Sequence, residues 1–168
     1  MLPLPSTTLP DWETLKRTVY SDDGSLRDIY VLDTTREDWN RWIAFVNARY
    51  PVRWEAEGHN GGAPATAINA DFIARRWDAG REQLTVLAAV FLGNVQANCH
   101  FFVETNIEQD LAPGEIRTPA DHEQVLAYLI DLSTALSKEV ILTEESAEEA
   151  VWFRVNGTCV EYISAPYI

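Results

Sequence analysis

The sequence predicts an α+β fold in which two principal helices pack on a mainly antiparallel β-sheet of about seven to eight strands. Two segments begin with helix-capping residues and continue with apolar side chains at helical spacing. Two hairpins are predicted at Gly93-Asn94 and Asn156-Gly157, which are typical two-residue turns. Strands and helices do not alternate regularly, so a βαβ series is disfavoured. We expect residues 1–168 to form a single α+β domain, given the chain length.

Two strong helices are expected after Thr34 and Thr118. Thr34 is followed three residues later by Glu37, and Thr118 is followed by proline at the first helical position. A short helix is also predicted between residues 10 and 19. The apolar positions of the two strong helices are Trp39, Trp42, Ile43 and Val46 in the first, and Val125, Leu129, Leu132 and Leu136 in the second. We expect Trp39 and Trp42 to pack in the core.

The strands are assigned from short β-prone runs bounded by turn residues. They cover residues 29–32, 52–55, 84–92, 95–103, 140–142, 151–155 and 158–163. The runs 84–92 and 95–103 are expected at the centre of the sheet, because the first is apolar on both faces.

Three segments are assigned with less regular patterns. Residues 68–77 satisfy neither the helical nor the strand period, and a strand is favoured over a helix. Residues 104–117 are polar and contain Pro113-Gly114, which predicts a loop that crosses between a strand and a helix. Residues 58–64 are rich in glycine and predict a surface loop.

Composition excludes several protein classes. Hydrophobic residues make up 46% and charged residues 23% of the chain, which is typical of a folded domain. The two cysteines, Cys99 and Cys159, lie in apolar stretches and are expected to be reduced and in the core. No signal peptide and no membrane-spanning run is found, so we expect a cytoplasmic protein.

The negative charge is concentrated in the C-terminal part. Of the net charge of −13, residues 104–168 contribute −10, from 13 acidic and 3 basic side chains. Such a field disfavours nucleic acid and anionic membranes and attracts a basic protein partner. The densest cluster is expected in one helical turn and comprises Glu144, Glu145, Glu148 and Glu149. This cluster is the candidate partner-binding patch, and the alternative is a solvated surface.

Motifs for catalysis, cofactors and metals are missing from the sequence. Neither phosphate-binding glycine motif is present, and no serine lies in a nucleophile-elbow context. The histidines His59, His100 and His122 have no zinc-type spacing. Cys99 and His100 are adjacent, but successive side chains on a strand point to opposite faces. We therefore predict no metal and no cofactor, and assign no catalytic residue.

The glycine loop is the best candidate for a small-ligand site. Trp54 and Trp77 border the loop Gly58–Gly62 in the sequence and are expected to form an exposed aromatic patch. His59 and His100 are the histidines that could join such a site. The candidate ligand-binding residues are Trp54, His59, Trp77 and His100.

Three functional hypotheses follow. The leading one is a non-catalytic acidic binding protein, such as an inhibitor or immunity-type protein that masks a basic protein partner. The alternative is a small-ligand-binding protein or enzyme with its site near the Gly58–Gly62 loop. The third is a homo-oligomer subunit in which the 18 Phe, Trp and Tyr residues supply a self-interface.

Overall fold

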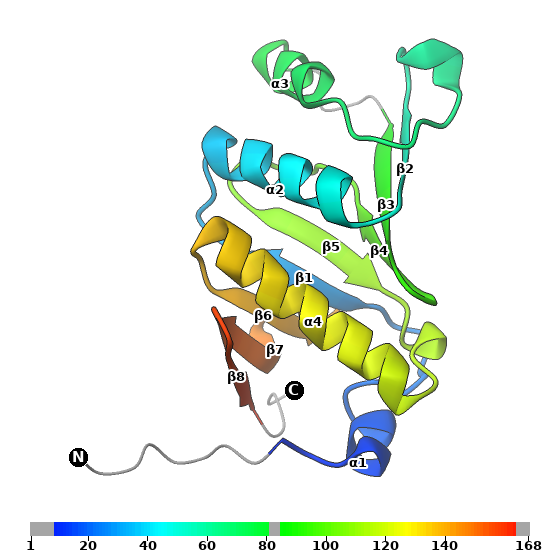
Figure 1. The fold of residues 1–168 in the computed structure, drawn as a ribbon, viewed down its shortest axis with the longest axis vertical. Helices are drawn as coiled ribbons and strands as arrows, with labels where there is room; N and C mark the ends of the chain where they lie inside the picture. Colours follow the sequence, from blue (N-terminus) through cyan, green and yellow to red (C-terminus); the bar gives the residue numbers. More distant parts are fainter. Residues whose placement is uncertain (1–8, 81–84, 164–168) are drawn as a thin grey trace, which may run out of the picture.

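The computed structural model describes residues 9–80 and 85–163 and confirms the predicted α+β fold. One eight-stranded antiparallel sheet carries α2 and α4 side by side on the same face (Figure 1). The helices are α1 (Trp12–Arg17), α2 (Arg36–Arg49), α3 (Ala70–Asp78) and α4 (Pro119–Leu136). The strands are β1 (Arg27–Val31), β2 (Val52–Ala56), β3 (Val86–Leu92), β4 (Val95–Cys99), β5 (Ile107–Leu111), β6 (Val140–Glu144), β7 (Ala147–Asn156) and β8 (Cys159–Tyr162).

The strand order across the sheet is β2-β3-β4-β5-β1-β6-β7-β8. Both predicted hairpins are present, with Leu92 opposite Val95 and Asn156 opposite Cys159. Strands β3 and β4 each have two neighbours, as expected for strands with apolar faces, but β5 and β1 occupy the middle of the sheet. Strand β1 reaches the centre because it inserts between two strands that come much later in the sequence.

The core lies between the sheet and the helix pair. Trp39 and Trp42 of α2 are buried there, as predicted. The Trp42 Nε1 donates a hydrogen bond to the Tyr128 hydroxyl at 3.1 Å, and that hydroxyl donates to Gln109 Oε1 at 2.5 Å. This buried polar chain fixes α2, α4 and β5 relative to one another, since buried polar groups need partners.

The two principal helices begin with capping boxes. In α4, Thr118 and Asp121 exchange hydrogen bonds around Pro119, as the sequence predicts. In α2 the cap is Thr35, paired with Asp38, one residue later than predicted. No helix in the described ranges is both long and apolar enough to cross a membrane.

Residues 70–78 form α3, so the strand expected over 68–77 is wrong. The Asn69 side chain accepts a hydrogen bond from the Phe72 amide at 2.9 Å and starts the helix. Ile73 is buried and faces the core, whereas Arg75 is exposed. An asparagine N-cap stabilises the first turn and therefore overrides the ambiguous apolar pattern.

The expected crossing loop over 104–117 is also wrong in part, because it contains the central strand β5. Ile107, Gln109 and Leu111 face the helices and are buried. Glu108 and Asp110 alternate with them and lie on the other face of the sheet. The segment looks polar in sequence because half of a strand in a one-sided sheet faces solvent.

The two cysteines differ in environment. Cys99 is buried, as predicted, and burial raises the pKa of its thiol. Cys159 is exposed, so its assignment to the core was wrong. It begins the edge strand β8, where alternate side chains point to solvent.

Candidate functional site

The face of the sheet opposite α2 and α4, here called the open face, carries no helix in the part of the chain that the structure describes (Figure 1). Acidic side chains meet there at the centre of the sheet. In the β1–β5 pair, Asp28 lies opposite Asp110, and Tyr30 lies opposite Glu108. Like charges directly opposite each other on neighbouring strands are destabilising. The Asp28–Asp110 pairing therefore opposes folding and needs another explanation.

The central carboxylates lack a basic partner within residues 9–80 and 85–163. Neither Asp28 nor Glu108 takes part in an ion pair with lysine or arginine there. Burial, together with the charge of Asp110, raises the pKa of Asp28. Burial and the charge of Asp28 likewise raise the pKa of Glu108. The open face consequently holds uncompensated negative charge that a cation would stabilise.

Neighbouring polar groups hold these carboxylates in place. The Tyr30 hydroxyl lies 3.2 Å from Asp28 Oδ2 and 3.4 Å from Glu108 Oε1, and it donates its single proton to one of them at a time. Asn98 Nδ2 donates to Asp110 Oδ1 at 3.0 Å. His100 Nε2 lies 3.3 Å from Asp110 Oδ2, so this sequence-predicted residue borders the open face and not the glycine loop.

The turn between β6 and β7 brings two of the four predicted partner-binding glutamates, Glu145 and Glu148, close to the acidic centre of the open face. This turn replaces the expected helical turn, because Ser146 has a positive φ of 55° and reverses the chain. The Ser146 amide donates to Asp28 Oδ2 at 2.6 Å, which places the turn against β1. The charges of Glu145 and Glu148 act on Asp28 and Glu108, respectively, and raise their pKa values further.

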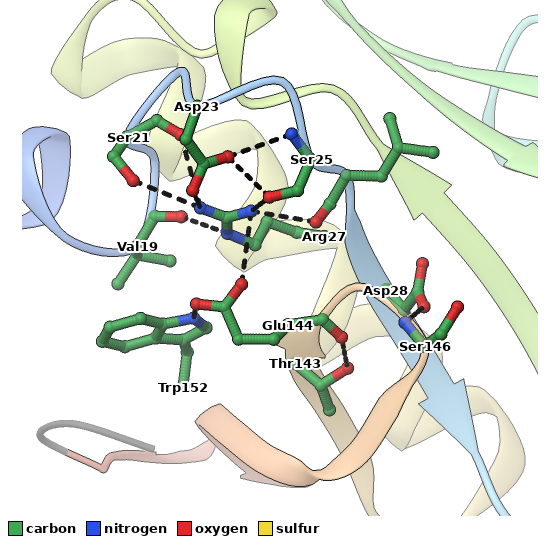
Figure 2. A network of polar contacts seen from close by, with 11 residues as sticks. Val19, Ser21, Asp23, Ser25, Arg27, Asp28, Thr143, Glu144, Ser146 and Trp152 are labelled. Carbon is green, nitrogen blue, oxygen red and sulfur yellow. Dashed lines mark hydrogen bonds and ion pairs between the residues drawn. The ribbon is translucent and has the colours of Figure 1, made fainter. Parts of the chain in front are cut away.

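The other two predicted glutamates have different positions. Glu144 lies 3.4 Å from the Arg27 Nη1 and accepts a hydrogen bond from Trp152 Nε1 at 3.1 Å (Figure 2). It belongs to the buried network around Arg27, where it compensates a charge within the protein. Glu149 is exposed on β7.

Large apolar side chains adjoin the acidic centre, in the loop after β4. Phe102 is 58% exposed and Val103 is 44% exposed. The His100 ring stacks on Phe102 with centroids 5.1 Å apart. Phe101 has a φ of 55° and is buried against Trp39. This left-handed residue ends β4 at Cys99, earlier than predicted, and turns Phe102 outward. Such a backbone conformation is unfavourable for a bulky residue and marks functional segments.

The glycine loop borders a separate pocket of about 450 Å³, here called the loop pocket. It is lined by Gly58, His59, Asn60, Phe72, Arg75, Arg76 and Ala79. Residues 60–62 form one turn of 3-10 helix within the predicted loop. Of the candidate ligand-binding residues, only His59 lines this pocket.

The exposed tryptophan patch predicted beside the loop is wrong. Trp54 is fully buried beneath His59, with ring centroids 4.4 Å apart. Trp77 is half-buried against Trp39, at 5.0 Å between centroids, and Arg36 lies over its ring. Both side chains face the core because β2 and α3 pack against the same apolar cluster as α2.

Comparison with protein families, characterised proteins and solved structures found no match for this chain. Within the described residues, no group of three or more His, Cys, Asp and Glu side chains is arranged to hold a metal ion. Two features therefore remain for a functional argument: the open face and the loop pocket.

Sequence reasoning missed the residues at the centre of the open face. Glu108 and Asp110 are neighbours on one segment, but Asp28 lies 80 and 82 positions before them, so the cluster of all three is not visible along the chain. The alternation Ile107, Gln109 and Leu111 is a signal that could have identified β5 and its two outward acids. That alternation does not predict which strand pairs with β5, so the contact of β5 with β1 is known only from the tertiary structure.

Stability should depend on pH through Glu108. Its pKa is raised above the ordinary 4.5, so the unfolded chain releases this proton at lower pH than the folded protein does. Glu108 therefore lowers the free energy of unfolding at neutral pH, and this effect disappears as the pH falls through its folded pKa towards 4.5. Glu108→Gln should stabilise the protein at about pH 7.5 and have little effect at about pH 4.

Chemical denaturation across this pH range checks the prediction. The comparison with wild type is needed because burial lowers the pKa of His122 below 6.5, which destabilises the fold as the pH falls. That contribution is common to both proteins and cancels in the difference. If the difference in the free energy of unfolding between Glu108→Gln and wild type did not change with pH, this result would contradict the raised pKa of Glu108.

Proposed function

We propose that this protein binds and masks a basic protein through the open face, as an inhibitor or immunity-type protein does. The observation that carries the proposal is the placement of Asp28 opposite Asp110 in the central strand pair, where no lysine or arginine of the described residues forms an ion pair with either carboxylate and only His100 contacts Asp110. Arrangements that lower stability persist where they serve binding. Asp28 is only 3% exposed, so a lysine or arginine of a partner would donate charge-assisted hydrogen bonds to the more accessible Glu108 and Asp110 and thereby relieve the repulsion.

The open face also carries apolar side chains. On the β1, β6 and β7 side these are the buried cluster of Tyr30, Ile141 and Val151, with Leu32 and Ile163 packed against it. On the loop after β4, Phe102 and Val103 are exposed beside His100. Protein interfaces combine aromatic anchors with charged groups that fix the orientation of the partner. Phe102 is therefore the expected anchor.

The C-terminal bias of charge supports the same partner chemistry. Residues 104–168 include Glu108, Asp110, Glu145 and Glu148, which all contribute to the electrostatics around Asp28 and Tyr30. A surface with this field accelerates association with a basic protein at low ionic strength.

Site-specific photo-crosslinking tests the proposal. A photoreactive benzophenone amino acid is placed at Phe102 and, as a control, at the exposed Ala127 on α4. We expect one basic protein of the source cell to be crosslinked from position 102 and not from position 127. The crosslink should weaken at about 1 M salt, where the Debye length is about 3 Å.

The captured protein is then purified and its binding measured directly. A stable complex that blocks the captured protein's own activity supports the proposal. Equal crosslinking from both positions, capture of acidic proteins, or yields that do not change with salt would each argue against binding at the open face.

A further inference from the structure

The loop pocket combines basic and aromatic groups on a chain whose net charge is −13. We propose that it binds a small organic anion, a phosphate or carboxylate group attached to a flat ring. Arg75 would contact the anionic group, Arg76 forms the adjacent pocket wall, and His59 with Phe72 would contact the ring. This site is distinct from the open face and does not depend on the function proposed for that face.

Helix α3 brings the pocket residues together. Phe72, Arg75, Arg76 and Ala79 are spaced three, four and seven positions apart, which places them on one face of the helix. That face looks onto the loop at Gly58, His59 and Asn60. A strand over these residues would have divided them between two faces, so the pocket exists only because the segment is helical.

The two arginines have complementary roles. Arg76 is only 7% exposed, and its Nη1 donates to the Phe101 carbonyl at 3.1 Å, which fixes the side chain in the pocket wall. Arg75 is exposed and is free to move onto a ligand. The acid one turn before it, Asp71, forms no ion pair with Arg75 among the described residues. Arginine matches planar anions with two parallel hydrogen bonds.

The pocket also has an aromatic part, formed by His59 of the loop and Phe72 of α3. The His59 ring packs against the buried Trp54 at a tilt of 58°, with centroids 4.4 Å apart, and meets Phe72 edge-on with centroids 5.4 Å apart. These rings present flat surfaces at which a ligand ring can pack face-on or edge-on. The volume of about 450 Å³ lies within the range of small-molecule sites.

Binding is tested by NMR titration of the full chain with phenyl phosphate and, separately, benzoate. We expect shifts of the Gly58 and Asn60 amides and the His59 ring, and a Kd on the order of 1 mM or below for at least one compound. Comparing the titration with phenyl phosphate and the titration with benzoate shows whether the pocket prefers a phosphate or a carboxylate. Inorganic phosphate and benzyl alcohol, each carrying half of the ligand, should bind at least roughly fivefold more weakly.

Two variants locate the site. Arg75→Gln changes an exposed side chain and should weaken binding roughly five- to tenfold without loss of stability. Arg41→Gln on α2, also exposed, is the matched control and should bind as wild type does. The proposal is overturned if neither compound shifts these signals, if Arg75→Gln binds as tightly as wild type, or if inorganic phosphate binds as well as phenyl phosphate. None of these outcomes affects the open face, which Arg75 does not border.

Discussion

Replacing Arg27 with methionine should lower the free energy of unfolding by about 3–5 kcal/mol. Arg27 is fully buried, and its guanidinium is surrounded by oxygen atoms from residues 19–26 and from Glu144 of β6 (Figure 2). Nε donates to the Val19 carbonyl at 2.7 Å, and Nη1 donates to Ser25 Oγ at 2.7 Å. Methionine fills a similar volume but leaves these acceptors without their donor and the Glu144 carboxylate without its ion-pair partner.

Equilibrium denaturation of Arg27→Met and Arg27→Lys measures this effect. Lysine keeps the charge but carries one nitrogen, which cannot reach the separate acceptors that the guanidinium fork satisfies. We therefore expect Arg27→Lys to lose more than half of the stability lost by Arg27→Met. Arg41→Met removes an exposed arginine paired with Glu37 and should change stability by less than about 0.5 kcal/mol. A loss below about 1 kcal/mol for Arg27→Met would show that the network contributes little.

Removing two charges from the open face should affect stability and binding in opposite directions. The double variant Glu108→Gln, Asp110→Asn keeps the side-chain shapes and retains an acceptor for Asn98. It removes the repulsion on Asp28, so the free energy of unfolding should rise by about 0.5–1 kcal/mol at neutral pH. Affinity for the partner identified by crosslinking should fall by about tenfold or more, because close interfacial charge pairs are lost.

The matched control is Glu13→Gln, Glu123→Gln, which removes two exposed charges from α1 and α4. Denaturation and a binding titration on both double variants separate local charge from net charge. Equal losses of affinity in the two double variants would attribute binding to net charge alone. A destabilised Glu108→Gln, Asp110→Asn protein would contradict the view that these carboxylates oppose folding.

The sequence by itself determined the fold class and the local structure at the helix starts and tight turns. Thr118 with Pro119, and the pairs Gly93-Asn94 and Asn156-Gly157, were assigned correctly because caps and two-residue turns depend on neighbouring residues alone. Burial of Trp39 and Trp42 followed from helical spacing for the same reason. An acidic surface for a basic partner was predicted from composition, and it stays a proposal.

Only the tertiary structure decided where the candidate sites lie. Asp28 and Asp110 are 82 positions apart, and they face each other because β1 inserts beside β5, a long-range pairing that no local signal specifies. The loop pocket likewise required α3 to be helical and to pack beside the turn at Gly58. Trp54 was misplaced because it was assigned from its position beside the glycine loop, whereas its burial is set by residues from other elements. Caps and tight turns depend on neighbouring residues, whereas both candidate sites arise from contacts between elements that lie far apart in the sequence.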